Sequence, residues 1–177
     1  MYIEALLAFV RGIIISIKIM LNGGKVGKRL RIGKNCRIRI RKGSYINIGN
    51  NVVIGDGVKL STLNGGVLNV GSNTSIGDYS QIVCHNKINI DDGCNIAPHV
   101  YMYDHDHKYN VDGVKSKEYI VGNILIGRNS WIGVNTVILR DTVIGQNCVI
   151  GAGSVIKSRI EDSVRYIQKR IENKKRL

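Results

Sequence analysis

Two histidines and two aspartates alternate in the four-residue segment Asp104-His105-Asp106-His107. Imidazole ionises near neutral pH, so it can take a proton from a hydroxyl or amino group under physiological conditions. A neighbouring carboxylate can hold the ring in the tautomer whose unprotonated nitrogen faces the substrate. The segment therefore predicts a general base, oriented by Asp104 or by a backbone carbonyl. A polar surface loop without a catalytic role is the alternative.

A six-residue period predicts the scaffold behind this segment. Aliphatic residues stand six apart from Ile126 to Ile156, and a small residue follows each of the first five after four positions. The period matches neither an α-helix at 3.6 residues per turn nor a strand at 2. It suits a chain that turns a corner after each short strand, so that three sides close one triangular coil and the coils stack through parallel ladders. We therefore expect an all-β parallel β-helix.

The same phase recurs earlier, with breaks where loops leave the coil. It appears from Ile32 to Ile38, from Ile48 to Leu60, from Val70 to Ile82 and from Ile90 to Ile96. The longest break contains the histidine-rich segment, and loops on a rigid solenoid are where binding groups usually lie. We expect one β-helical domain over residues 22–157, with a functional loop over 102–123.

The stretch IGRNSWIGVNTVILRDTVIGQNCVIGAGSVI, preceded by a His-bearing loop after IAPHVYMY, resembles the hexapeptide-repeat acetyltransferases. That family includes maltose, galactoside and serine acetyltransferases and many polysaccharide O-acetyltransferases. The resemblance implies a left-handed β-helix and a homotrimer with active sites between neighbouring subunits. It implies acetyl-CoA as donor and a sugar hydroxyl as acceptor, in cell-surface polysaccharide biosynthesis. An amino-sugar acceptor and an acyl group longer than acetyl stay open.

The resemblance also implies roles for individual residues. Ungapped spacing from IAP makes His107 the base that deprotonates the acceptor for direct attack on the thioester, and His105 is the alternative. On the acceptor side the family pattern points to His85, and we expect Tyr103 and Asp106, beside the histidines, to contact the substrate as well. The backbone amide of Val134 is expected to face the thioester carbonyl. The residues expected to bind the cofactor are Trp131, Gly133, Val134, Ala152, Lys157 and Ser158.

The C-terminal segment departs from the family. Related enzymes continue into a proline-containing turn, whereas residues 160–177 here contain neither proline nor glycine. Val164, Ile167 and Ile171 would share one side of a helix. We therefore expect a short basic amphipathic helix over residues 158–177, and the contacts to the adenine end of the cofactor are not assigned.

Metal catalysis is the second enzyme class to weigh. Some trimers of six-residue repeats are γ-class carbonic anhydrases that hold zinc through three histidines, and His85 and His99 could join His105 and His107 as ligands. The spacing does not match that family, and the WIG and GAGS elements fit the acyltransferases better. No CxxC pair is present to support a zinc ribbon. We therefore expect no bound metal, and we expect His99 to have a structural role. A non-catalytic solenoid that serves as a scaffold or binding module is the third class of function.

Residues 1–21 are predicted to form a mostly apolar helix. Its charges, Glu4, Arg11 and Lys18, stand seven apart and so share one stripe. At about 30 Å the helix is long enough to span a bilayer, but three charges argue against spanning. A helix lying on the membrane surface is favoured. A helix that caps the open end of the solenoid is the alternative, and both can hold.

The net charge of +13 is concentrated at the two ends of the chain. Residues 1–42 carry eleven Lys or Arg against the single acid Glu4. Basic ends attract anionic lipid or a phosphorylated cofactor, whereas no recognition helix or aromatic platform points to nucleic acid. A secretory signal has basic residues before its apolar stretch, whereas here the basic residues follow the apolar stretch. We expect a cytoplasmic protein, peripheral on the inner face of the membrane through residues 1–42, with a lipid-linked glycan as the acceptor.

Overall fold

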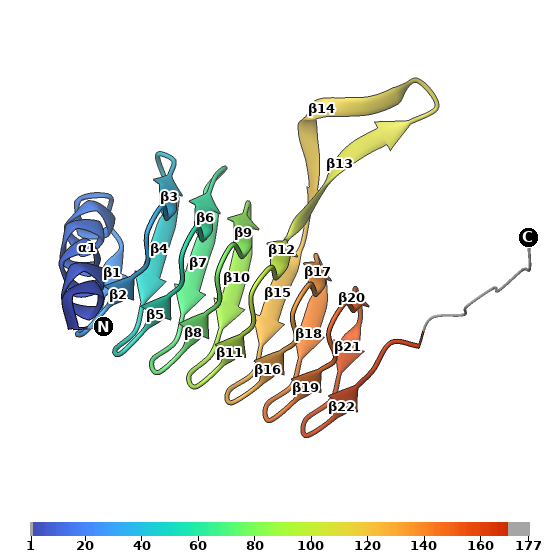
Figure 1. The fold of residues 1–177 in the computed structure, drawn as a ribbon. Coiled ribbons are helices and arrows are strands. Elements are labelled where there is room, and N and C mark those ends of the chain that lie inside the picture. The colour runs from blue at the N-terminus through green and yellow to red at the C-terminus, as the bar shows by residue number, and fades with distance from the viewer. Residues whose placement is uncertain (1, 170–177) are drawn as a thin grey trace, which may run out of the picture.

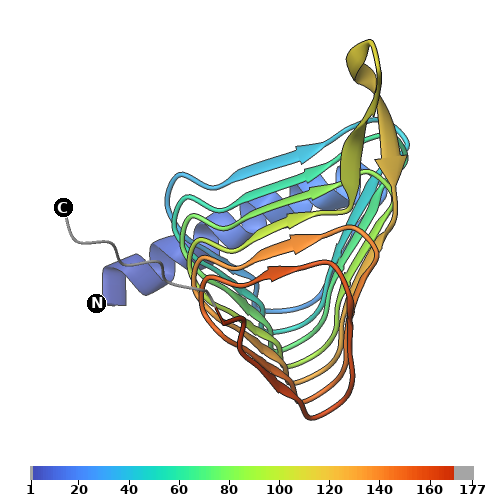
Figure 2. The same cartoon turned by 90° about the vertical axis from the view of Figure 1, so that its right-hand side faces the viewer.

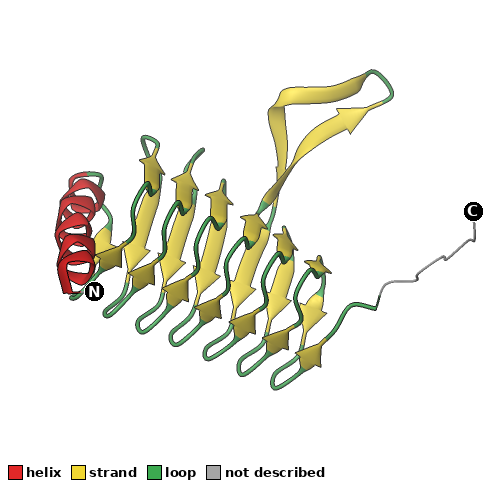
Figure 3. Ribbon diagram, in the orientation of Figure 1, coloured by secondary structure: helices red, strands yellow, loops and turns green. Residues whose placement is uncertain are grey.

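The computed structural model describes residues 2–169, which form one helix followed by a three-sided parallel β-solenoid (Figures 1 and 3). Face A contains β1 Lys25–Val26, β4 Tyr45–Ile48, β7 Val67–Val70, β10 Lys87–Ile90, β15 Asn123–Ile126, β18 Thr142–Ile144 and β21 Arg159–Ile160. Face B contains β2 Arg31–Ile32, β5 Val53–Ile54, β8 Ser75–Ile76, β11 Asn95–Ile96, β16 Trp131–Ile132, β19 Val149–Ile150 and β22 Arg165–Tyr166. Face C contains β3 Arg37–Ile40, β6 Lys59–Thr62, β9 Gln81–Cys84, β12 Tyr101–Tyr103, β17 Val137–Leu139 and β20 Val155–Ile156.

The six-residue period builds the core as predicted. The aliphatic residues from Ile126 to Ile156 are at most 1% exposed, and the small residues between them are equally buried. Each strand pairs in register with its counterpart in the next coil; Ile88, for example, lies between Leu68 and Ile124. Because the side chains of a strand alternate between its two faces, every coil turns one row of aliphatic residues into the triangular interior seen in Figure 2. This arrangement fits the left-handed β-helix.

The corners of the triangle explain the asparagines of the repeat. Within residues 2–169, seven asparagines have a positive φ near 55°, among them Asn51, Asn73, Asn129 and Asn147. Asparagine tolerates this left-handed conformation better than other residues with a side chain. The asparagines therefore let the chain turn with little strain at the corners that they occupy.

The predicted loop over residues 102–123 is largely an antiparallel hairpin. Strands β13 His105–Asn110 and β14 Gly113–Val121 pair with each other and stand away from the solenoid (Figure 1). The chain leaves the coil after Asp104 and returns at Gly122, whose N–H donates to the Asp104 carbonyl at 2.7 Å. The hairpin therefore starts and ends at one corner, between faces C and A.

The helix predicted over residues 158–177 is wrong for the part that the structure describes. Residues 158–169 continue the solenoid through β21 and β22, where Ile160 pairs with Ile144 and Tyr166 with Ile150. The parallel ladder pairs these residues with the preceding coil, whereas a short helix without tertiary packing is only marginally stable in water. Residues 170–177, which include Ile171, lie outside the described residues.

Helix α1 (Tyr2–Leu21) lies across the N-terminal end of the solenoid (Figures 1 and 2). Ile19 is fully buried against the first coil, so the helix closes the open end of the core. Across residues 2–169, none of the helical structure is sufficiently long and apolar to cross a membrane.

Candidate active site

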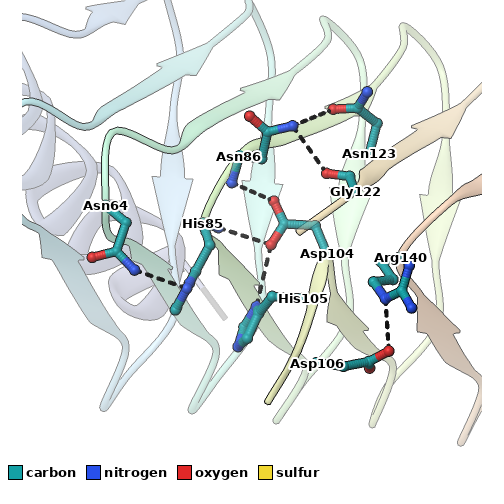
Figure 4. A network of polar contacts seen from close by, with 9 residues as sticks. All are labelled: Asn64, His85, Asn86, Asp104, His105, Asp106, Gly122, Asn123 and Arg140. Atoms are coloured by element: carbon teal, nitrogen blue, oxygen red, sulfur yellow. Dashed lines mark hydrogen bonds and ion pairs between the residues drawn. The ribbon is translucent and has the colours of Figure 1, made fainter. Parts of the chain in front are cut away.

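Asp104 is the buried centre of a polar cluster at the corner between faces C and A (Figure 4). Its carboxylate accepts hydrogen bonds from the backbone N–H groups of His85 and Asn86, both at 2.8 Å. Its Oδ1 also lies 3.2 Å from Nδ1 of His105. Burial opposes ionisation, but the bonds from His105 and from the two backbone N–H groups outweigh it and lower the pKa of Asp104. Asp104 is therefore a carboxylate at neutral pH.

The contact with Asp104 defines the tautomer of His105. A carboxylate only accepts, so Nδ1 of His105 carries the proton and Nε2 keeps its lone pair. Nε2 is then the nitrogen that can accept a proton from a substrate. Tyr103, at the end of β12, packs edge-on against the ring of His105, with the ring centroids 6.1 Å apart. Burial raises the pKa of the Tyr103 hydroxyl, which stays protonated.

His85 lies directly against His105. The two rings stack with centroids 3.7 Å apart and planes 11° from parallel. Burial, together with the neighbouring imidazoles of His105 and His107, lowers the pKa of His85 despite the opposing effect of Asp104. The side-chain amide nitrogen of Asn64 lies 3.0 Å from Nδ1 of His85 and donates to it, which places the His85 proton on Nε2.

Two members of this cluster were not predicted from the sequence. Tyr119 of β14 packs edge-on against His85 at 4.5 Å and against His105 at 5.3 Å, so the hairpin covers the stacked pair. Asn64 stands in the sequence Asn-Gly-Gly, which indicates only a turn. Neither residue type signals a site by itself, and only the stacking of coils brings them to His85.

His107 and Asp106 lie on the hairpin rather than in the buried cluster. His107 is exposed and packs beside Tyr119, with ring centroids 4.8 Å apart. Within residues 2–169 its ring has no hydrogen bond to a carboxylate. The Asp106 carboxylate pairs with Arg140, whose Nε lies 2.6 Å away, and with Lys157 at 3.4 Å. Burial raises the pKa of Asp106, but the contacts with Arg140 and Lys157 outweigh this effect and lower the pKa. The same two contacts hold the base of the hairpin against the next coils.

Most of the residues predicted to bind the cofactor gather at a different corner. Trp131 is exposed at the start of β16 and pairs with Val149, and Gly133 packs so closely on Ala152 that a Cβ there would lie 2.6 Å from its backbone nitrogen. The carbonyl of Val134 accepts a bond from the Gly153 N–H at 2.8 Å. This set, which we call the WIG corner (Trp131, Gly133, Val134 and Ala152), joins faces B and C.

The WIG corner and the histidine cluster lie at opposite ends of the face C strands. Val134 precedes β17, whereas Arg140 follows it, and β17 pairs in register with β12, which leads to Asp104. At about 3.3 Å per residue, the two corners are on the order of 15–20 Å apart within one chain. Of the predicted cofactor residues, only Lys157 and Ser158 lie at the corner of the histidines.

Two other predicted features have structural positions. Cys84 is fully buried, and desolvation with the nearby Asp104 raises the pKa of its thiol strongly, so it is a core residue and a poor nucleophile. His99 stacks on Tyr79 with centroids 5.4 Å apart, at the end of β12 opposite to the histidine cluster. In the described part of the chain, no group of three His, Cys, Asp or Glu side chains is placed to hold a metal ion.

Comparison with known proteins agrees with this architecture. The family model described as bacterial transferase hexapeptide (six repeats) matches residues 123–158. A sequence search of curated proteins gave no match. Among solved structures, the chain is similar to AntD, an N-acyltransferase from Bacillus cereus in complex with dTDP and coenzyme A. The TM-score is 0.70 at 24% identity, over 90% of this chain and 88% of that one.

Two further solved structures have the same fold. One is a hexapeptide-repeat acetyltransferase of Vibrio cholerae complexed with acetyl-coenzyme A, with a TM-score of 0.52 at 22% identity over 84% of this chain and 67% of that one. The other is the polySia-specific acetyltransferase NeuO, with a TM-score of 0.50 at 22% identity over 78% of this chain and 64% of that one. Residues 123–158 therefore match the hexapeptide-repeat model, and the chain has the β-helical fold of these solved structures, as the sequence predicted.

Proposed function

We propose that the protein transfers an acetyl group from acetyl-CoA to a hydroxyl group of a sugar, in the biosynthesis of a cell-surface polysaccharide. The observation that carries the proposal is the contact between Asp104 and His105, which leaves Nε2 of a half-buried imidazole available as a base. The similar structures from Bacillus cereus and Vibrio cholerae hold coenzyme A and acetyl-coenzyme A. A thioester donor matches this base, because the acceptor needs only to lose a proton as it attacks.

The chemistry follows from the two tautomers. Nε2 of His105 takes the proton of the acceptor hydroxyl while the oxygen forms a bond to the thioester carbonyl carbon. The carbon–sulfur bond then breaks, and the thiolate of coenzyme A receives the proton from His105. Asp104 stabilises the imidazolium that exists between these steps. His85, neutral with its proton on Nε2, is suited to donate a hydrogen bond to the acceptor.

His107 is the second candidate for the base, because ungapped spacing from IAP favours it. The structure supports His105 instead, since its ring contacts a buried carboxylate and His107 lies exposed on the hairpin. Substituting each histidine alone by glutamine separates the two assignments.

A homotrimer completes the proposed site. The backbone N–H of Val134 is the proposed donor to the thioester oxygen, and it lies on the order of 15–20 Å from the histidine corner of its own chain. One acetyl group cannot contact both corners of a single chain. If the WIG corner of one subunit faces the histidine corner of its neighbour, three equivalent sites form around a three-fold axis.

An amino-sugar acceptor is the second candidate function. It is favoured by the likeness to AntD in complex with dTDP-4-amino-4,6-dideoxyglucose and coenzyme A, at a TM-score of 0.68 and 24% identity over 90% of this chain and 88% of that one. The test is to incubate the protein with labelled acetyl-CoA and panels of sugars and amino sugars, and then to treat the isolated products with alkaline hydroxylamine. Hydroxylamine releases label from an ester but not from an amide. Label that resists release identifies N-acetylation, and no labelled product from any acceptor contradicts the proposal.

A further inference from the structure

The charged side chains of helix α1 make polar contacts with the first coil of the solenoid. The Nε of Arg11 donates to the carbonyl of Ile32 at 2.7 Å, and the Nζ of Lys18 donates to the carbonyl of Ile38 at 2.6 Å. Glu4 pairs with Lys34 of the first coil at 3.0 Å. The cations thus satisfy carbonyl groups at the open end of the solenoid, which has no further coil to pair with.

Close packing holds the helix in this rotation. A Cβ on Gly12 would lie 2.0 Å from the carbonyl oxygen of Leu30, so only glycine allows the helix to approach the coil this closely. Ile19, about two helical turns further on, is fully buried. The side of the helix that carries Gly12 and Ile19 therefore cannot turn outward without losing these contacts.

The opposite side of the helix is apolar and exposed. Ile3, Leu6, Val10, Ile14, Ile17 and Leu21 follow at intervals of three and four residues and form one stripe, which we call the outer stripe. Their exposures reach 73% at Ile3 and 82% at Leu21. A water-facing helix on a soluble protein normally presents the reverse arrangement, because its polar residues face solvent. The outer stripe therefore indicates a surface that is covered by an apolar partner.

Exposed basic residues lie on the first coil, next to helix α1. Lys25, Lys28, Arg29 and Arg31 are exposed on the first coil, immediately after the helix. Phe9, Arg29 and Arg31 line one side of an open cavity of about 740 Å³ where the helix overhangs face B. An apolar stripe flanked by guanidinium and ammonium groups is complementary to a surface with acyl chains below anionic headgroups.

We propose that the outer stripe of α1 binds the surface of an anionic lipid bilayer, with the helix lying in the plane of the interface. A second copy of the chain would be a poorer occupant, because residues 1–42 carry a net charge of +10 and two such ends would repel each other. The helix serves as cap and anchor at once: its charges hold the solenoid and its apolar side enters the membrane.

This orientation stands the solenoid on the membrane by its N-terminal end. Asp104 follows β12, the fourth strand of face C, so it lies three coil spacings from the first coil, or about 15 Å. Resting on the proposed acyl transfer, the acceptor is then a sugar held within a few units of the bilayer, such as a glycan linked to a membrane lipid. The membrane contact itself does not depend on that reaction.

The experiment is cosedimentation of the purified full chain with vesicles of phosphatidylglycerol and phosphatidylcholine in about equal parts, compared with phosphatidylcholine alone. The test variant combines Val10→Gln with Ile14→Gln, which removes apolar area without changing charge. The matched control combines Val111→Gln with Val114→Gln in the hairpin, where both valines are also exposed. Thermal unfolding checks that each variant is folded.

We expect the wild-type protein and the control variant to bind the anionic vesicles, and to bind them more weakly in high salt. The vesicle affinity of the Val10 and Ile14 variant should be lower by a factor of about ten or more. Equal binding by the test variant and the wild type overturns the proposal. Light scattering without lipid tests self-association: if the wild-type particle is twice the size of the test variant, the outer stripe is covered by another copy. Vesicle binding uses no acetyl-CoA, so its failure is independent of the proposed reaction.

Discussion

The imidazole rings of His85 and His105 stack in parallel, with centroids 3.7 Å apart, although 20 positions separate them in the chain. The stacking joins two coils, since His85 follows β9 and His105 follows β12, which pairs with β9. Asp104 bridges both, through the His85 backbone and the His105 ring. In the proposed reaction, the His105 ring accepts a proton and the His85 ring donates a hydrogen bond.

Replacing His105 by glutamine should lower kcat by about 10²–10⁴-fold, the usual contribution of a general base. The same change at exposed His107 should lower it much less. Thermal unfolding of both variants should stay near that of the wild type. If His107→Gln is the inactive variant and His105→Gln keeps its activity, the base assignment is reversed.

Replacing Asp104 by asparagine should destabilise the fold by about 1–3 kcal/mol, because an amide –NH2 replaces one acceptor oxygen opposite two buried N–H donors. Denaturant unfolding measures this change. The pKa of Asp104 is lowered in the folded state, so its contribution to stability is present above its ordinary pKa of 3.8 and is lost as pH falls below about 4. The wild-type advantage over Asp104→Asn should therefore shrink in acid, and an advantage that persists at low pH would contradict the account.

The ring of His85 should titrate below the ordinary histidine pKa of 6.5 in an NMR pH series. Burial disfavours the protonated form of His85, and so does the repulsion that would arise if both stacked rings carried a proton. His105→Ala removes this repulsion and uncovers one face of the His85 ring, so the His85 pKa should rise in that variant. An unchanged or lower value would show that the stacked pair is not coupled.

Gly12→Ala tests the docking of α1. Alanine is more favourable than glycine in the interior of a helix by about 1 kcal/mol, so helix propensity alone predicts that the substitution stabilises the protein. The Leu30 carbonyl leaves no room for a methyl group, and we expect faster hydrogen exchange over residues 2–21 together with a lower Tm. A raised Tm would mean that the helix does not pack on the first coil as described.

Mixing two variants tests whether the proposed homotrimer forms its sites between subunits. His105→Gln removes the proposed base, and Ala152→Trp obstructs the WIG corner at an exposed position. Chains that carry one change each should be inactive alone. After joint unfolding and refolding in equal amounts, about a quarter of the interfaces combine an intact His105 with an intact WIG corner, so about a quarter of the activity should return. No recovery would place the whole site in one chain.

The core could be predicted because its determinant is local and periodic. Every aliphatic residue of the six-residue phase that the sequence identified is buried. The C-terminal helix was predicted wrongly because Val164 and Ile167 have a helical spacing, whereas the register of Ile160 and Tyr166 against the preceding coil decides the structure. A ladder to a neighbouring coil is a tertiary interaction, and a local pattern does not contain it.

The residues of the candidate site could be predicted from the sequence, but the contacts between them could not. Asp104 and both histidines are visible in the sequence, but the choice between His105 and His107 depends on where the chain leaves the coil. Asp104 stands two positions after buried Met102 and therefore points inward, which sets His105 at the corner and His107 on the hairpin. The stripe of Glu4, Arg11 and Lys18 is equally visible in the sequence. Its contacts with the first coil are tertiary interactions, so the sequence pattern does not contain them.

Isothermal titration calorimetry with acetyl-CoA tests the central claim most directly, with elemental analysis of the same sample for metal. We expect saturable binding of one acetyl-CoA per chain and no stoichiometric metal. Ala152→Trp should abolish this binding, and His105→Gln should preserve it. Absence of binding by the folded wild-type protein, with about one zinc per chain, would contradict acyl transfer and make the histidines a ligand set.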